Sequence, residues 1–220
     1  IFKDADVEAA VKHCAAGKFR NAGQVCISPT RFFVEEQVYD EFIKLFKSHV
    51  EAINVGDGLD SKSNMGPLVA DRRLEVMEDF ISDAISSGGE VISGGGRGQS
   101  PGSFFEPTLI RDVPDTAKIM VEEPFGPVAP SAPFSSIDEI IERANSLPFG
   151  LASYAFTSNP RTSQILKSEI ESGMLAINSM HIHSVETPFG GLKHSGYGYE
   201  GSIEGLEAFL VTKYSSEIYA

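Results

Sequence analysis

Residues 19–26, FRNAGQVC, place a cysteine in a setting that suits covalent catalysis. A cysteine attacks a carbonyl carbon as its thiolate, so positive charges that lower its pKa raise its reactivity. Lys18, Arg20 and Arg31 are close to Cys26 in the sequence and could supply such charge. A buried, inert thiol is the alternative interpretation and the more common use of a cysteine inside cells. The residues alone leave both interpretations open.

Three segments of the chain resemble motifs of the aldehyde dehydrogenase superfamily. Residues 19–26 are similar to its nucleophile signature, and a basic residue follows five positions later, at Arg31. Residues 122–128, EEPFGPV, and residues 188–196, PFGGLKHSG, are similar to two further motifs in the same order. The resemblance covers essentially the whole chain and favours Cys26 as the nucleophile. It implies an NAD(P)-dependent enzyme that oxidises an aldehyde to the carboxylic acid, with Cys26 forming the thiohemiacetal and thioester intermediates.

Part of the family pattern lies outside this sequence, which begins at Ile1 and has no Glu-Leu-Gly-Gly segment. In the family, the Glu of that segment is the general base, and the nicotinamide-binding domain lies further upstream. We therefore expect this chain to be the C-terminal catalytic domain of a longer NAD(P)-dependent enzyme. The isolated chain is expected to be inactive and could then serve only as an assembly module.

The cofactor residues are inferred from the resemblance. Glu123 and Phe125 match the family positions that hold the nicotinamide ribose and flank the ring, so we expect both to contact NAD or NADP. The alternative is a structural turn, because Pro124 and Pro127 would fix the backbone at the entry to a strand.

The same resemblance indicates the substrate. Val25, Ile27, His183 and Phe189 match positions that line the aldehyde pocket. Arg20 matches the arginine with which succinate-semialdehyde dehydrogenases bind the far carboxylate of the substrate, and a guanidinium suits that task because it binds carboxylates bidentately. Succinate semialdehyde or a similar ω-oxo acid is therefore the favoured substrate.

Two positions depart from those enzymes. They carry Ser where this chain has His183, and some carry a second, redox-active Cys where it has Ser28. A dehydrogenase that passes the thioester to coenzyme A is the alternative within the superfamily.

Two other patterns carry little weight. Gly196, Gly198 and Gly201 form a Gly-x-Gly-x-x-Gly, but no strand is predicted directly before them, as a dinucleotide fingerprint requires. His181 and His183 have no third ligand nearby in the sequence, so no metal is expected.

Composition narrows the function class. The chain has 220 residues, 41% of them hydrophobic, and a net charge of −13, which argues against binding to nucleic acid. No apolar run approaches the roughly 18 residues that span a bilayer. Two cysteines do not make a disulfide framework, and a reactive thiol is best kept reduced, so we expect a cytoplasmic protein.

Periodicity and turn residues locate the elements. Asp6 is a suitable helix cap, Cys14 falls on the apolar face of the helix that follows, and residues 88 and 89 are glycines suited to ending a later helix. The predicted helices are residues 7–19, 36–53, 70–87, 137–146, 160–171 and 202–209. The predicted strands are residues 30–35, 90–93, 105–110, 127–133, 151–157, 173–178 and 210–214.

This alternation predicts an α/β fold with a mostly parallel open sheet and helices on both faces. We expect residues 1–200 to form the cysteine-bearing catalytic domain and residues 201–220 a C-terminal helix and oligomerisation strand. An apolar terminal strand needs a partner edge, and the resemblance implies a homodimer or homotetramer.

Overall fold

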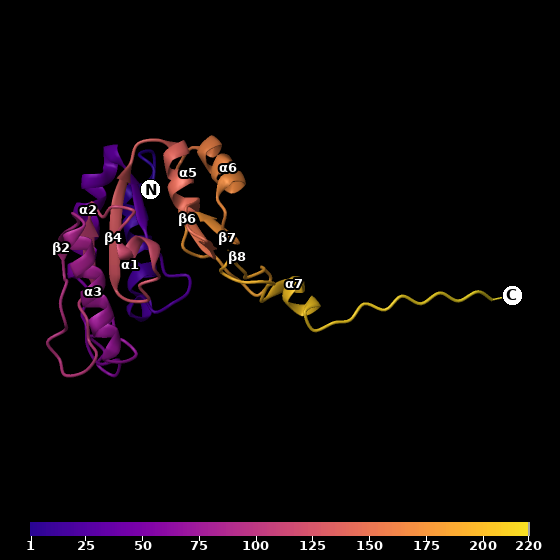
Figure 1. Cartoon of the computed structure of the whole chain (residues 1–220), viewed down its shortest axis with the longest axis horizontal. Helices are drawn as coiled ribbons and strands as arrows, with labels where there is room; N and C mark the ends of the chain where they lie inside the picture. Colours follow the sequence, from indigo (N-terminus) through magenta and orange to yellow (C-terminus); the bar gives the residue numbers. More distant parts are fainter. Residues whose placement is uncertain (220) are drawn as a thin grey trace.

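The computed structural model describes residues 1–219 and has an α/β fold (Figure 1). Its main sheet has four strands in the order β1-β4-β3-β2. Strand β4 pairs in parallel with both β1 and β3, while β2 pairs with β3 antiparallel. The strands are β1 (Phe32–Glu35), β2 (Glu90–Ser93), β3 (Thr108–Arg111) and β4 (Val128–Phe134). The predicted mostly parallel sheet is therefore confirmed.

The later strands form two smaller sheets. Strand β6 (Ala152–Ala155) pairs in parallel with β7 (Met174–Ile177), and β5 (Phe149–Gly150) pairs with β8 (Leu192–Lys193). Ile1 and Phe2 connect the β1 edge to the β6 edge: the backbone N–H of Glu35 donates to Ile1, and that of Phe2 donates to Phe156. The prediction had placed these strands in one continuous sheet.

Helices flank the main sheet and the β6–β7 sheet, and the ranges of the six predicted helices agree with the observed ones within two residues. The helices α1, α2 and α3 lie beside the main sheet, and α5 and α6 lie beside β6 and β7 (Figure 1). A short helix, α4, had not been predicted. The helices are α1 (Val7–Phe19), α2 (Glu36–Glu51), α3 (Arg72–Ser86), α4 (Lys118–Val121), α5 (Ile137–Asn145), α6 (Pro160–Glu169) and α7 (Ser202–Glu207).

The predicted helix ends have their expected chemistry. The Asp6 side chain accepts from the N–H of Ala9 and caps α1. Gly88, just beyond α3, has φ of 109°, a conformation that glycine adopts without steric cost. Cys14 is buried in the main core, as its position on the apolar face of α1 predicted.

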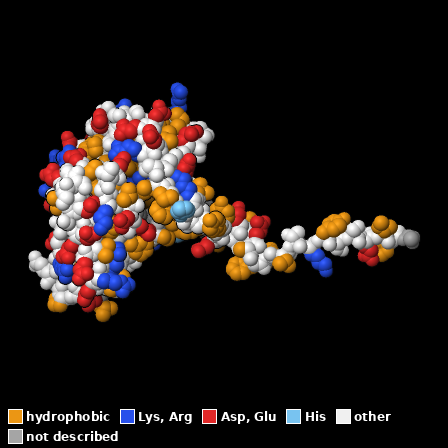
Figure 2. Space-filling model, in the orientation of Figure 1, with side chains coloured by type: hydrophobic (Ala, Val, Ile, Leu, Met, Phe, Trp, Pro, Cys, Tyr) orange, Lys and Arg blue, Asp and Glu red, His pale blue; other side chains and the backbone are white. Residues whose placement is uncertain are grey.

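The chain ends in an extended segment beyond α7. Residues 208–219 make no strand pair within the described part of the chain and project away from the folded body (Figure 1). Hydrophobic side chains recur along this segment, while charges of both signs are mixed over the body (Figure 2). The oligomerisation role of residues 210–214 stays a prediction, and Ala220 lies outside the described residues.

A cavity of about 160 Å³ lies between β1 and β6. Its lining includes Phe32, Tyr154 and Phe156 but not Cys26. No described helix combines the length and apolar character needed to cross a membrane.

Candidate active site

The loop before Cys26 has an unusual backbone. It follows α1 as a short helical turn, η1 (Arg20–Gly23), in which Asn21, Ala22 and Gly23 have φ of 52°, 53° and 72°. Consecutive left-handed residues, one of them alanine, are strained and persist only where surrounding contacts impose them. Such strain is most often found at functional sites.

Gln24 supplies part of those contacts. Its side-chain amide donates to the carbonyls of Asn21 and Pro67, and its side-chain oxygen accepts from the N–H of Val69 at 2.8 Å. The Asn21 side chain donates to the Gln24 carbonyl. These two polar residues of the motif therefore tie the loop to itself and to residues 67–69.

Cys26 lies in a turn, residues 25–28, that is held by further hydrogen bonds. The N–H of Ser28 donates to the Val25 carbonyl at 2.9 Å, and the Ser28 hydroxyl donates to the Lys18 carbonyl at 3.2 Å. From β6, the Tyr154 hydroxyl donates to the Ile27 carbonyl at 2.8 Å. Within residues 1–219 the backbone N–H of Cys26 has no hydrogen-bond acceptor.

The two cysteines differ as predicted in burial. Cys26 is exposed, whereas Cys14 is buried. Burial raises the pKa of the Cys14 thiol to about 12, so this thiol stays protonated and inert at neutral pH. Of the two, Cys26 is the one that a substrate can reach.

The three cations near Cys26 in the sequence have different surroundings. Arg20 is exposed, and no ion pair is recorded for it within residues 1–219. Lys18 is only 1% exposed, and burial lowers its pKa to about 7, an effect that the Glu123 carboxylate opposes. At neutral pH, Lys18 therefore carries only part of a positive charge.

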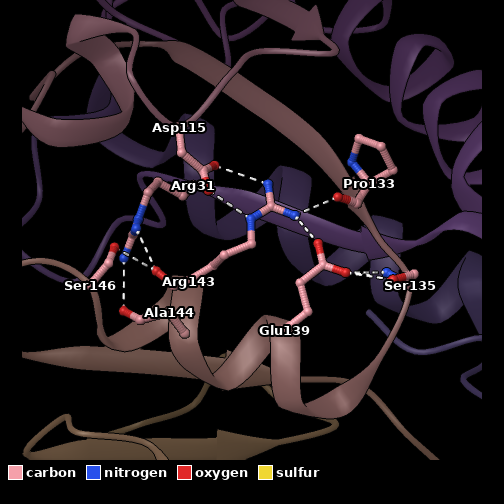
Figure 3. A network of polar contacts seen from close by, with 8 residues as sticks. All are labelled: Arg31, Asp115, Pro133, Ser135, Glu139, Arg143, Ala144 and Ser146. Atoms are coloured by element: carbon pink, nitrogen blue, oxygen red, sulfur yellow. Dashed lines mark hydrogen bonds and ion pairs between the residues drawn. The ribbon is translucent and has the colours of Figure 1, made fainter.

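The third cation, Arg31, is bound to the end of α5. Its guanidinium donates to the carbonyls of Arg143 and Ala144 (Figure 3). It also lies over the ring of Phe33. Arg143 next to it is held by Asp115 and Glu139 (Figure 3). Arg31 thus links the residue before β1 to the end of α5, and its effect on the charge around Cys26 stays a prediction.

The segment that contains Glu123 and Phe125 lies against the Cys26 loop. A Cβ added at Gly23 would lie 2.1 Å from the carbonyl oxygen of Gly126, so the two backbones touch. Glu123 is exposed, and Phe125 is 39% exposed with φ of 41°. An exposed carboxylate and an exposed ring on a segment that touches the Cys26 loop suit a nucleoside ligand with hydroxyls and a flat base.

Sequence reasoning did not single out Arg73, which holds this segment. Its guanidinium donates to the Pro124 carbonyl at 2.5 Å. Tyr154 was missed in the same way. Neither residue belongs to a local motif, since each meets its partner only through the fold.

The predicted substrate residues fall into two groups. Val25 and Ile27 flank Cys26 and are half-buried. His183 and Phe189 come together in the loop after β7, with ring centroids 6.1 Å apart and nearly perpendicular. Their contact with a substrate beside Cys26 stays a prediction.

The other two patterns have plain structural correlates. Gly196, Gly198 and Gly201 all have positive φ. The strand directly before them, β8, has only two residues and ends at Lys193. His181 stacks on His183, and residues 1–219 contain no group of three His, Cys, Asp or Glu side chains placed to hold a metal.

Comparison with known proteins identifies relatives of the chain. The model of the Aldehyde dehydrogenase family matches residues 1–215. The chain is 44% identical over 214 residues to the probable succinate-semialdehyde dehydrogenase [NADP(+)] of Sinorhizobium fredii, which covers 97% of this chain and 44% of that protein. It is 43% identical over 211 residues to the 4-(hydroxymethyl)benzenesulfonate dehydrogenase TsaD1 of Comamonas testosteroni, covering 96% of this chain and 44% of that protein.

A solved structure matches as well. The succinate-semialdehyde dehydrogenase of Burkholderia pseudomallei superposes with a TM-score of 0.94 at 38% identity, covering 96% of this chain and 44% of that chain. The chain thus spans less than half the length of the relatives that it matches.

Proposed function

Because the chain belongs to the aldehyde dehydrogenase family, we propose that it carries the catalytic cysteine of an NAD(P)-dependent enzyme that oxidises an aldehyde bearing an anionic group. The observation that carries the proposal is the exposed Cys26 on a restrained turn with its own N–H free. The thiolate attacks the carbonyl carbon, and the oxyanion of the resulting thiohemiacetal accepts from that N–H.

The residues present fit a nicotinamide cofactor. Glu123 offers a carboxylate for ribose hydroxyls, and Phe125 offers a ring face beside the Cys26 loop. When bound, NAD or NADP supplies the acceptor for the hydride that leaves the substrate carbon. Cys26 then holds the acyl group as a thioester until water or coenzyme A releases it.

An anionic substrate is supported by Arg20 and by the relatives. Arg20 is exposed six residues before Cys26, with no ion pair recorded for it within the described chain. Relatives named for succinate semialdehyde and for a benzenesulfonate share an anionic group remote from the reacting carbon. We propose succinate semialdehyde or another ω-oxo acid, bound by Arg20 and lined by Val25, Ile27, His183 and Phe189.

Assembly and location follow the same proposal. Residues 1–200 act as the catalytic unit, and the extended segment after α7 pairs with a second copy in a homodimer or homotetramer. Its exposed apolar side chains, among them Phe209, Leu210 and Val211, support such pairing. A reducing cytoplasm keeps Cys26 a free thiol.

The test uses the full-length protein that carries this chain. Wild type should form reduced cofactor with succinate semialdehyde, Cys26→Ser should not, and Cys14→Ala is the matched control that should stay active. Mass spectrometry of the product separates release as the acid from release as the coenzyme A thioester. Equal activity of wild type and Cys26→Ser would refute the proposal.

A further inference from the structure

We propose that Tyr154 is a positioning residue for Cys26 and that it acts by holding the Ile27 carbonyl. This inference rests on the proposed function, since it assigns to Tyr154 a part in placing the nucleophile. Tyr154 does not itself exchange a proton or a bond with the substrate.

The contact spans the fold. Tyr154 lies in β6, and its hydroxyl donates to the carbonyl of Ile27, 127 residues away in the sequence, at 2.8 Å. The other bonds of the Val25–Ser28 turn come from within residues 18–28. Tyr154 therefore links β6 to this turn. Gln24 makes a separate link, from the loop to residues 67–69.

The bond acts on the peptide group next to the nucleophile. The peptide between Ile27 and Ser28 is planar, so its carbonyl and its N–H turn together. The carbonyl is held by Tyr154, and the N–H donates to Val25. With both ends bound, this peptide is held in one orientation, and the Cys26 N–H has no acceptor within residues 1–219. Loss of the hydroxyl frees one end, which allows the turn to reorient.

The Tyr154 hydroxyl lies near the candidate site. Burial, and to a lesser extent the charge of Cys26, raise the pKa of Tyr154 to about 12, while Arg20 opposes the rise. The hydroxyl therefore stays protonated as a donor at neutral pH. Its hydrogen bond to the carbonyl of Ile27, the residue after Cys26, places the hydroxyl close to the turn of the nucleophile.

A purely structural role for Tyr154 makes a different prediction. The ring is half-buried and packs against the main core, which a phenylalanine would also do. Tyr154→Phe keeps the ring and removes only the donor. The matched control is Tyr39→Phe. The Tyr39 hydroxyl is hydrogen-bonded to Ser131 and accepts from the N–H of Asp112, but Tyr39 lies on the buried face of α2.

The experiment compares both variants in the full-length protein. Tyr154→Phe should lower kcat about 10-fold and change KM and cofactor affinity less than about 2-fold, because misplacing a reacting group affects the chemical step most. It should also change the rate at which iodoacetamide alkylates Cys26 without cofactor. Tyr39→Phe should lower the unfolding midpoint and leave kcat and alkylation unchanged.

The results distinguish failure of the Tyr154 role from failure of the proposed function. Wild-type kcat and wild-type alkylation in Tyr154→Phe, with Cys26→Ser inactive, would overturn the role of Tyr154 and leave the proposed function intact. An equal effect of both tyrosine variants on kcat would also overturn it. Equal activity of the wild type and the Cys26→Ser variant would overturn both proposals.

Discussion

Gly23 and Gly126, 103 positions apart in the sequence, are in direct backbone contact: a Cβ on Gly23 would lie 2.1 Å from the Gly126 carbonyl oxygen. This contact joins the loop of the proposed nucleophile to the segment of the proposed cofactor residues. Gly23 also has φ of 72°, a backbone conformation that residues other than glycine rarely adopt. Both features depend on the missing side chain.

Gly23→Ala should therefore lower stability and activity together. The strained conformation costs about 1–3 kcal/mol, and the clash must be relieved by moving one of the two segments. Differential scanning calorimetry and kcat/KM measure the two effects. Gly66→Ala is the control, because a Cβ there meets nothing within 4 Å. Matching melting temperatures for the two variants would contradict the importance of this contact.

Cys26 should react with iodoacetamide at neutral pH much faster than Cys14. Cys26 is exposed, while burial raises the pKa of Cys14 to about 12. Peptide mapping by mass spectrometry after brief alkylation of the folded protein gives both rates. Equal labelling would remove the physical reason for choosing Cys26.

Arg20→Ala should reduce kcat/KM for succinate semialdehyde about 10- to 150-fold and affect an uncharged aldehyde of similar length far less. This range corresponds to a lost hydrogen bond between charged groups of about 1.5–3 kcal/mol. Arg161→Ala, at an exposed position on α6, is the matched control. Equal losses for both aldehydes would mean that Arg20 supports the loop instead.

His183→Ser should be tolerated if His183 only lines the pocket.

Lys18→Met should remove a pH dependence of stability. Burial lowers the pKa of Lys18 to about 7 in the folded protein from 10.5. Between those values the unfolded chain binds more protons than the folded one, so the Lys18 contribution becomes more favourable as pH rises. The variant should be the more stable protein at pH 7, by a margin that narrows toward about pH 10. Thermal unfolding across this range checks the trend, with Lys12→Met, exposed on α1, as control. A constant margin would contradict the buried charge.

The chain of residues 1–220 alone should fold without oxidising aldehydes. Its core is extensive, but it spans only 44% of the Sinorhizobium relative, and the resemblance places the base and the dinucleotide site outside it. Circular dichroism and reduced-cofactor formation test the two parts. Turnover at an ordinary dehydrogenase rate, from material whose mass shows that it begins at Ile1, would refute this division.

Local patterns determined much of this protein before its structure. Helical periodicity placed Cys14 in the core, Asp6 predicted the start of α1, and Gly88 the end of α3. These signals depend on residues a few positions apart, so the printed sequence contains them in full. The motif around Cys26 likewise indicated a family through its own residues.

Only the tertiary structure decided which groups meet. Arg31 lies five residues from Cys26 in the sequence, yet its guanidinium binds the end of α5, and Lys18 is buried instead of offering an exposed charge. Tyr154 reaches Ile27 across 127 residues, a pairing that no local period encodes. Such contacts depend on how the sheets and helices pack, and burial then sets each group's charge. The sequence shows which types of residue are present, but the folded structure determines which groups they contact and how they are protonated.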